Sequence, residues 1–137
     1  MTPKKIKIKQ EERSAARDYL KKATDNYQQM LSAIQSNNFN AASTLAVQCA
    51  ISSADAICVF EKGVRSVSKD HLDVCELTAS LPIEEAREKV KLLRKIIAKK
   101  NLIQYERRNM YRDEASEIVK SSARFHEWVK EHLAGEW

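Results

Sequence analysis

Apolar side chains recur every three or four residues along most of this 137-residue chain. That spacing places them on one face of an α-helix. The pattern divides into four long segments, and we predict one helix for each: about 16–34, 39–62, 83–111 and 113–133. In the first segment the apolar stripe comprises Ala16, Leu20, Ala23, Tyr27, Met30 and Ile34.

The second segment, residues 39–62, differs from the others because most of its apolar residues are small. Small side chains allow neighbouring helix axes to approach closely, so we predict that this helix lies at the centre of the fold. Its stripe comprises Phe39, Ala42, Ala46, Cys49, Ser53, Ala56 and Phe60. Gly63 follows at the place where a helix commonly ends on a residue with left-handed backbone.

A short helix is expected between the second and third long segments. The sequence VRSVSKDH, residues 64–71, is typical of a loop, and either Ser68 or Asp70 can cap the helix that follows it. The apolar residues of that helix are Leu72, Cys75 and Leu77. Pro82 then precedes the third long segment, where the first turn of a helix tolerates proline.

The scarcity of turn residues supports a helical fold. With only two glycines and two prolines, the chain lacks the turns that a β-sandwich or a barrel needs. We therefore predict an all-α protein, an antiparallel four-helix up-and-down bundle with one extra short helix, five helices in total. Residues 10–135 are expected to form this single domain, and residues 1–9 are expected to be a basic N-terminal tail.

Net charge and hydropathy exclude few classes of function or partner. The net charge is +5, and acidic and basic residues are mixed along the chain. That pattern is typical of a solvated helical surface, and it is also compatible with a polyanionic partner. The uncharged stretch 39–54 is too short and too polar to span a bilayer, so we expect no membrane association.

The cysteines indicate a reducing environment. Cys49 and Cys58 fall on opposite faces of one predicted helix, so we expect no disulfide framework and a cytoplasmic location. Neither the cysteines nor the histidines have the spacing of metal ligands. We therefore expect no metal and no other cofactor.

Asp55 is the first candidate for a special role, because it lies within the small-residue helix. Burying a lone carboxylate is costly, so this side chain needs either water or a partner. Arg65 and His71, in the loop that follows, are the nearest candidate partners. We expect Asp55, Arg65 and His71 to form a structural buried charge, and the alternative is that Asp55 is a catalytic acid.

The segment KKNLIQYERR, residues 99–108, is the second candidate. Lys100 and Arg107 follow Leu93 at intervals of seven residues, which puts all three near one helix face. Cations beside amide donors suit phosphate recognition, and a tyrosine ring can stack on a base. A solvated helix end is the alternative, because Lys and Arg also favour a helix C-terminus. The proposed nucleic-acid or nucleotide contacts are Lys100, Asn101, Gln104, Tyr105, Arg107 and Arg108.

Three stretches of the chain together resemble the HEPN domain. They are AASTLAVQCAISSADAICVFEKGVRSVSKDH, KKNLIQYE and ARFHEWVKEHL, and the resemblance covers roughly residues 15–134. It implies a bundle of four or five helices and a homodimer. Many HEPN domains are metal-independent ribonucleases. Others are inactive modules that bind nucleotides or partner proteins, and several pair with a minimal nucleotidyltransferase as toxin and antitoxin.

Active HEPN domains carry an arginine, often followed by asparagine, and a histidine about five residues after the arginine. The best-matching residues here are Lys100, Asn101 and Tyr105, so the charge and the amide are retained and the histidine is not. A second frame, beginning at Arg107 or Arg108, also lacks the histidine. The motif that the resemblance implies is therefore degenerate in this chain.

The missing histidine decides the expected activity. Tyrosine, with an ordinary pKa of about 10, is a poor base at neutral pH, whereas histidine titrates near 6.5. Lysine also lacks the bidentate fork of arginine. We expect a non-catalytic module that binds RNA, a nucleotide or a partner protein such as a minimal nucleotidyltransferase. The alternative is a ribonuclease toxin with an altered site that uses His71, and a purely structural bundle is a third reading.

Overall fold

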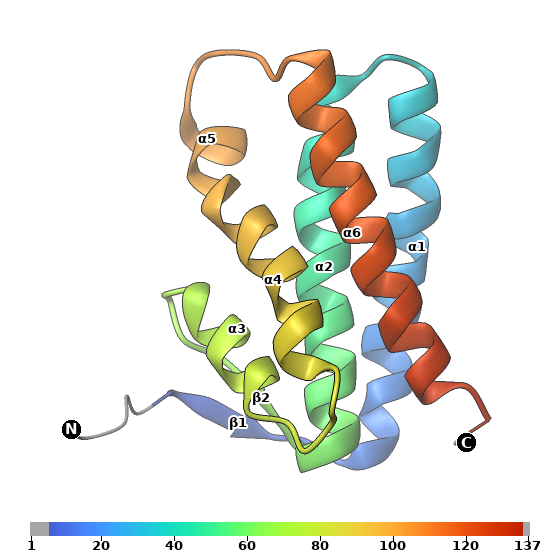
Figure 1. Ribbon diagram of the computed structural model, residues 1–137, viewed down its shortest axis with the longest axis vertical. Helices are drawn as coiled ribbons and strands as arrows, with labels where there is room; N and C mark the ends of the chain where they lie inside the picture. The colour runs from blue at the N-terminus through green and yellow to red at the C-terminus, as the bar shows by residue number, and fades with distance from the viewer. Residues whose placement is uncertain (1–5, 136–137) are drawn as a thin grey trace.

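The computed structural model describes residues 6–135, and these residues are mostly helical (Figure 1). A mostly helical chain is what the apolar spacing predicts. The helices are α1 (Ala16–Gln35), α2 (Phe39–Lys62), α3 (Leu72–Ala79), α4 (Ala86–Ala98), α5 (Lys100–Tyr105) and α6 (Arg112–Leu133). A 3₁₀ turn, Arg13–Ala15, precedes α1, and strands β1 (Ile8–Gln10) and β2 (Val64–Ser66) pair with each other.

Helix α2 lies at the centre of the protein, as its small residues predict. It packs against α1 and α6, and it also contacts α3, α4 and α5. Most of its residues are buried. Over residues 53–60 every residue is buried, so this part of the helix is enclosed on all sides rather than along one stripe. The hydroxyl of Ser122 on α6 donates a hydrogen bond to the carbonyl of Ala46 at 2.8 Å, which requires the two helices to lie close together.

Gly63 ends α2 and directs the chain into β2. Its φ of +66° is left-handed, a conformation that costs glycine least. The amide of Glu11 donates to the carbonyl of Gly63 at 2.8 Å, and a Cβ at position 63 would lie 3.4 Å from the carbonyl oxygen of Glu11. The glycine therefore permits both the turn and the close approach of the N-terminal segment.

The predicted N-terminal tail is too long, and the loop predicted for residues 64–71 contains a strand. Strand β1 pairs antiparallel with β2, with Lys9 opposite Arg65. Isoleucine and lysine alternate over residues 5–9, which is the pattern of a strand, but the run is too short to identify one without its partner. Residues 1–5 of the predicted tail lie outside the described residues.

The helix predicted for residues 83–111 is shorter and interrupted. Helix α4 ends at Ala98, and α5 gives way to extended backbone at Glu106. The loop that follows has partners elsewhere in the fold, because the amide of buried Met110 donates to Asn40 Oδ1 at 2.8 Å. The helix face predicted to join Lys100 to Arg107 therefore does not form.

Helix α2 is, among the helices of residues 6–135, the one long and apolar enough to cross a membrane. The stretch judged too short and too polar, residues 39–54, is only part of this helix. Length and composition do not separate a membrane span from the central helix of a folded domain. In this protein 72% of the apolar window is buried against other elements, which favours a core helix.

His126 on α6 is buried between α6 and α1. Its Nε2 lies 3.2 Å from the hydroxyl of Thr24, and its ring stacks on Tyr27 with the centroids 4.7 Å apart. Burial, with a smaller contribution from Lys130, lowers the pKa of His126 to about 4. The folded protein therefore holds this imidazole uncharged at neutral pH.

We predict that the free energy of unfolding decreases as the pH falls from about 6.5 toward 4, because the unfolded histidine takes up a proton that the folded one excludes. The variant His126→Phe keeps a ring at this position and removes the titrating group. Urea unfolding at several pH values should show that the free energy of unfolding decreases less with falling pH in this variant than in the parent protein. Equal losses in the two proteins would contradict the prediction.

Candidate functional site

A pocket of about 520 Å³ lies between the start of α3 and the junction of α4 with α5. It brings His71 together with Lys100, Asn101 and Tyr105, although these residues come from two distant parts of the chain. The full lining is Lys69, Asp70, His71, Leu72, Ile97, Ala98, Lys100, Asn101 and Tyr105. We call it the α3–α5 pocket. Three of the six predicted nucleic-acid contacts line it.

A series of hydrogen bonds, each from a backbone amide to the side chain two residues earlier, shapes the chain just before α3. The amide of Ser68 donates to the hydroxyl of Ser66, and the amide of Asp70 donates to the hydroxyl of Ser68. The amide of Leu72 then donates to Asp70 Oδ1 at 3.0 Å, as expected of a capping residue. Each bond fixes a backbone turn, and together they hold His71 at the mouth of the pocket.

His71 is uncharged at neutral pH in this setting. Its pKa is lowered first by burial and then by the positive charge of Lys100, while Asp70 partly offsets these effects. A neutral imidazole can accept a proton from a reacting group, or it can become protonated when an anion enters the pocket.

Tyr105 lies at the rim of the pocket and is 73% exposed. The ammonium group of Lys100 lies 5.4 Å from the centre of its ring, within the range of a cation–π contact. An exposed ring beside a cation can stack on a base while the cation meets a phosphate. Gln104, which was predicted to join this group, is half-buried on α5 and does not line the pocket.

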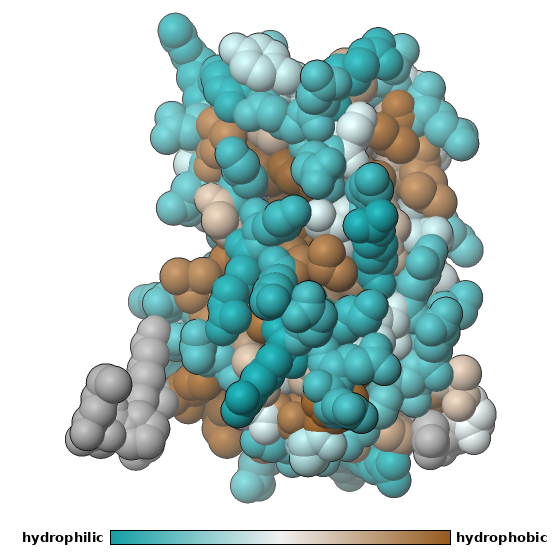
Figure 2. Space-filling model, viewed as in Figure 1, coloured by the Kyte–Doolittle hydropathy of each residue, from teal (hydrophilic) through white to brown (hydrophobic). Residues whose placement is uncertain are grey.

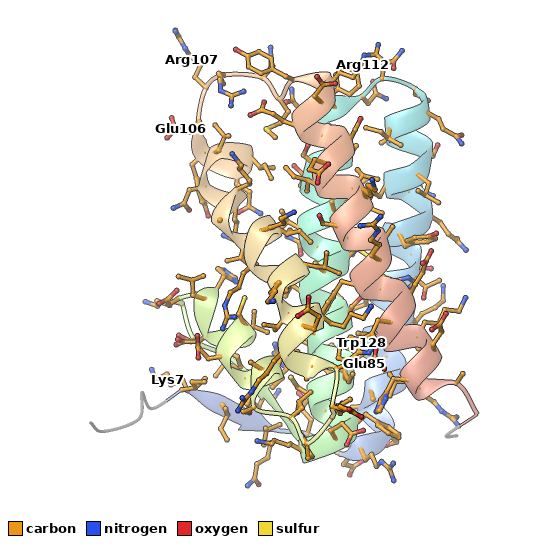
Figure 3. The ribbon with its side chains drawn as sticks, in the orientation of Figure 1. Lys7, Glu85, Glu106, Arg107, Arg112 and Trp128 are labelled. Carbon is orange, nitrogen blue, oxygen red and sulfur yellow. The ribbon has the colours of Figure 1, made fainter. Side chains whose placement is uncertain are left out.

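Arg107 and Arg108 also fall outside the α3–α5 pocket. Figure 3 shows Arg107 at the outer edge of the loop between α5 and α6, pointing away from the helices. Arg108 is held within the loop, because its guanidinium donates two hydrogen bonds to the carboxylate of Glu114, at 2.8 and 2.6 Å. This bond is the main cause that lowers the pKa of Glu114 to about 2. The structure thus divides the predicted cationic cluster in two.

A smaller pocket, of about 300 Å³, adjoins the α3–α5 pocket and shares His71 with it. Its lining is Ile51, Asp55, Arg65, Ser66, Val67, Ser68, His71 and Val74. All three residues of the predicted buried charge therefore line one cavity. We call it the Asp55 pocket.

Asp55 is 7% exposed, and Arg65 is the cation that pairs with it. The distance from Arg65 Nη1 to Asp55 Oδ2 is 3.9 Å, too long for a hydrogen bond. Burial raises the pKa of Asp55 to about 7, and the attraction of Arg65 opposes this only in part. The ionised carboxylate is therefore poorly compensated, and perturbed groups of this kind concentrate at functional sites.

Two residues that sequence reasoning missed also hold Arg65. Its Nε lies 3.6 Å from the carboxylate of Glu11, and its guanidinium lies 5.4 Å from the centre of the Tyr19 ring. The hydroxyl of Tyr19 donates to Glu11 at 2.9 Å. The alternation in residues 5–9 was the sole local signal that could have brought this N-terminal segment close to Arg65.

We predict that Asp55→Asn is more stable than the parent protein above pH 7. The pKa of Asp55 is raised by folding, so the ionised carboxylate lowers stability most above pH 7, and this effect shrinks as the pH falls toward the ordinary value near 3.9. Denaturant unfolding should show the full gain at pH 8 and roughly a third of it at pH 5. A variant less stable than the parent at pH 8 would mean that the Arg65 pair stabilises the fold.

Within residues 6–135, no group of three or more His, Cys, Asp or Glu side chains could hold a metal ion. The two pockets offer hydrogen-bonding groups, charged side chains and the exposed ring of Tyr105. Comparisons with protein-family models, with curated proteins and with solved structures found no match. The resemblance to the HEPN domain rests on the sequence stretches that carry it.

Proposed function

We propose that this chain is a HEPN-like, non-catalytic module that binds single-stranded RNA at the α3–α5 pocket. The observation that carries the proposal is the convergence of Lys100, Asn101, Tyr105 and His71 on one pocket. Lys100 and Asn101 supply the charge and the donors that a phosphate needs. Tyr105 supplies an exposed surface on which a base can stack.

The charges around the pocket favour an anionic ligand. Lys69 and Lys100 both line it, and Asp70 is its one acidic side chain. Asp70 already accepts the amide of Leu72, so its carboxylate is partly occupied. A phosphate that enters the pocket gains two cations and a histidine able to take up a proton, and it meets little opposing charge.

A second candidate function, a metal-independent ribonuclease with an altered site, is favoured by the position of His71. This histidine lies in the same pocket as the degenerate motif, and its lowered pKa keeps it in the form that accepts a proton. The arginine fork that would stabilise charge on the phosphate is replaced by Lys100, which is a single point charge. We therefore favour binding without cleavage.

We also propose that the helices form the antiparallel four-helix bundle of the HEPN domain, and that two copies associate through the face made by α4 and α6. An apolar groove of about 590 Å³ lies there, with Ile96 and Ile118 in its lining. Figure 2 shows apolar residues exposed between the charged residues of this face. Its two walls differ in charge, with Lys95 and Lys99 on one side and Asp113, Glu114 and Glu117 on the other.

This division of charge suits a two-fold axis parallel to the helices. Such an axis places α4 of one copy against α6 of the other, so lysines meet carboxylates twice. An axis perpendicular to the helices would instead place lysines against lysines. The apolar groove then becomes the centre of the interface, and the charged walls become its rim.

For RNA binding, we predict that Lys100→Ala and Tyr105→Ala each weaken the affinity for a short single-stranded RNA. The loss for Tyr105→Ala should be about 1–3 kcal/mol if the ring stacks on a base, and binding should weaken steeply as salt increases. Fluorescence anisotropy measures both effects. Lys21→Ala is the matched control, because it removes one exposed lysine from α1, outside both pockets. Equal losses in all three variants would argue against a specific site.

For catalysis, we predict no appreciable cleavage of RNA by the parent protein. The double variant Lys100→Arg with Tyr105→His rebuilds the HEPN motif, and cleavage that appears only in this variant supports a degenerate site. The assay follows a labelled RNA in the presence of a metal chelator. Cleavage by the parent protein that is lost in His71→Ala would favour the ribonuclease instead.

For assembly, we predict a mass by light scattering of about twice the 15.7 kDa of one chain. Glu117→Lys should yield monomers, because it places like charges at the interface. The double variant Lys95→Glu with Glu117→Lys should restore the dimer, since it also restores the contact at 3.8 Å between these side chains within each chain. A parent protein that remains monomeric at high concentration would rule out this interface.

A further inference from the structure

The carboxylate of Asp55 lacks hydrogen-bond donors. Its side chain is 10% exposed, and Arg65 reaches it only at 3.9 Å. Among residues 6–135, no group donates a hydrogen bond to it. Burial raises the pKa of Asp55 to about 7, so above pH 7 this group is mainly an ionised carboxylate. In that form it accepts hydrogen bonds and donates none, and a ligand that fits this position must bring N–H donors.

The other residues of the Asp55 pocket further restrict the kind of ligand that fits it. Ile51, Val67 and Val74 supply apolar walls that suit a flat ring. The hydroxyl oxygens of Ser66 and Ser68 each accept a backbone amide, which leaves their O–H hydrogens able to donate to a ligand carbonyl. The pocket therefore combines acceptors for N–H groups, donors for a carbonyl, and apolar surfaces for a ring.

The two pockets adjoin at His71. A nucleotide whose phosphate lies beside Lys100 can therefore place its base in the Asp55 pocket. Asp55 also lines a groove between α1 and α2, but that groove shares no residue with the α3–α5 pocket. The Asp55 pocket is thus the cavity that can serve the same ligand as the proposed phosphate site.

We propose that the Asp55 pocket is the base subsite of the RNA site and that it selects guanine. Guanine presents two adjacent donors, N1–H and the N2 amino group, to one carboxylate, while its O6 accepts from the seryl hydroxyls. Adenine and cytosine place an acceptor nitrogen beside their amino group, and uracil flanks its one N–H with two carbonyls. Each of these three bases therefore turns a lone pair toward Asp55. This inference rests on the proposed RNA-binding function.

The direct test measures the binding of GMP, AMP, CMP, UMP and IMP by calorimetry at pH 8, where Asp55 is mainly ionised. We expect GMP to bind about 10-fold or more tightly than AMP, CMP and UMP, the discrimination of one good bidentate pair. IMP retains N1–H and O6 and lacks the N2 amino group, so it should bind more weakly than GMP. This comparison changes the ligand alone and does not depend on how any variant folds.

Two variants test which residues are responsible, Asp55 for the preference for GMP and Lys100 for the binding of phosphate. Asp55→Asn should remove the preference for GMP, because the amide replaces one acceptor by a donor. Lys100→Ala should weaken all five nucleotides alike and leave the order unchanged. Equal binding of GMP and IMP, or a preference for GMP that survives in Asp55→Asn, would overturn the inference.

A uridine homopolymer separates this inference from the function on which it rests. If the homopolymer binds in a manner that depends on Lys100 and the nucleotides show no preference for guanine, RNA binding stands and guanine selection fails. If neither the homopolymer nor any nucleotide binds, both fail. Guanine preference together with dependence on Lys100 supports both.

Discussion

Close packing around helix α2 determines where the other helices lie. Its alanines, serines and cysteines have little side-chain volume, so the neighbouring helices can approach its backbone, as the bond from Ser122 to Ala46 illustrates. The same packing buries most of the Asp55 side chain and nearly all of His126. Burial is the leading cause of the pKa shift of both groups. Desolvation, rather than ion pairing, therefore sets the charge state of the interior.

Both pockets lie where the helical pattern stops. The left-handed turn at Gly63 sends the chain along β2, which carries Arg65, and the serine and aspartate turns then hold His71. The interruption at Lys99 separates α5 from α4. It places Lys100 and Tyr105 in the lining of the α3–α5 pocket, which His71 also lines. A rigid helical framework that positions polar groups on loops and helix ends is a common arrangement for binding sites.

Local patterns were sufficient to predict α1, α2 and α6, the central place of α2 and the end of α2 at Gly63. The pairing of Asp55 with Arg65 could also be predicted from the sequence, because the turn at Gly63 is all that lies between the helix of Asp55 and the strand of Arg65. The loop at 106–111 was not predictable, because Asn40 on α2 supplies its hydrogen bond. The pairing of Arg108 could not be predicted either. The sequence around it does not show whether its guanidinium is exposed to solvent or bonded to Glu114.

The meeting of His71 with Lys100 depends on how α3 packs against α4, and no local pattern encodes that contact. Strand β1 was hidden for a related reason: its three residues gain stability only from β2. The motif at Lys100, Asn101 and Tyr105 could be found from the sequence, and His71 could be named as a candidate to join it, but the rest of the second wall could not be found. Sequence reasoning therefore identified one half of the candidate site and left the other half to the structure.

Ultraviolet cross-linking of a short RNA that contains 4-thiouridine identifies the residues next to the RNA, and so tests whether RNA binds where α3 meets α5. After protease digestion, mass spectrometry identifies the peptides that carry the nucleotide. We expect cross-links at residues 69–72 and 100–105, and their loss in Lys100→Ala. Cross-links spread over the lysines of α1 and α4, unchanged in Lys100→Ala, would contradict this expectation.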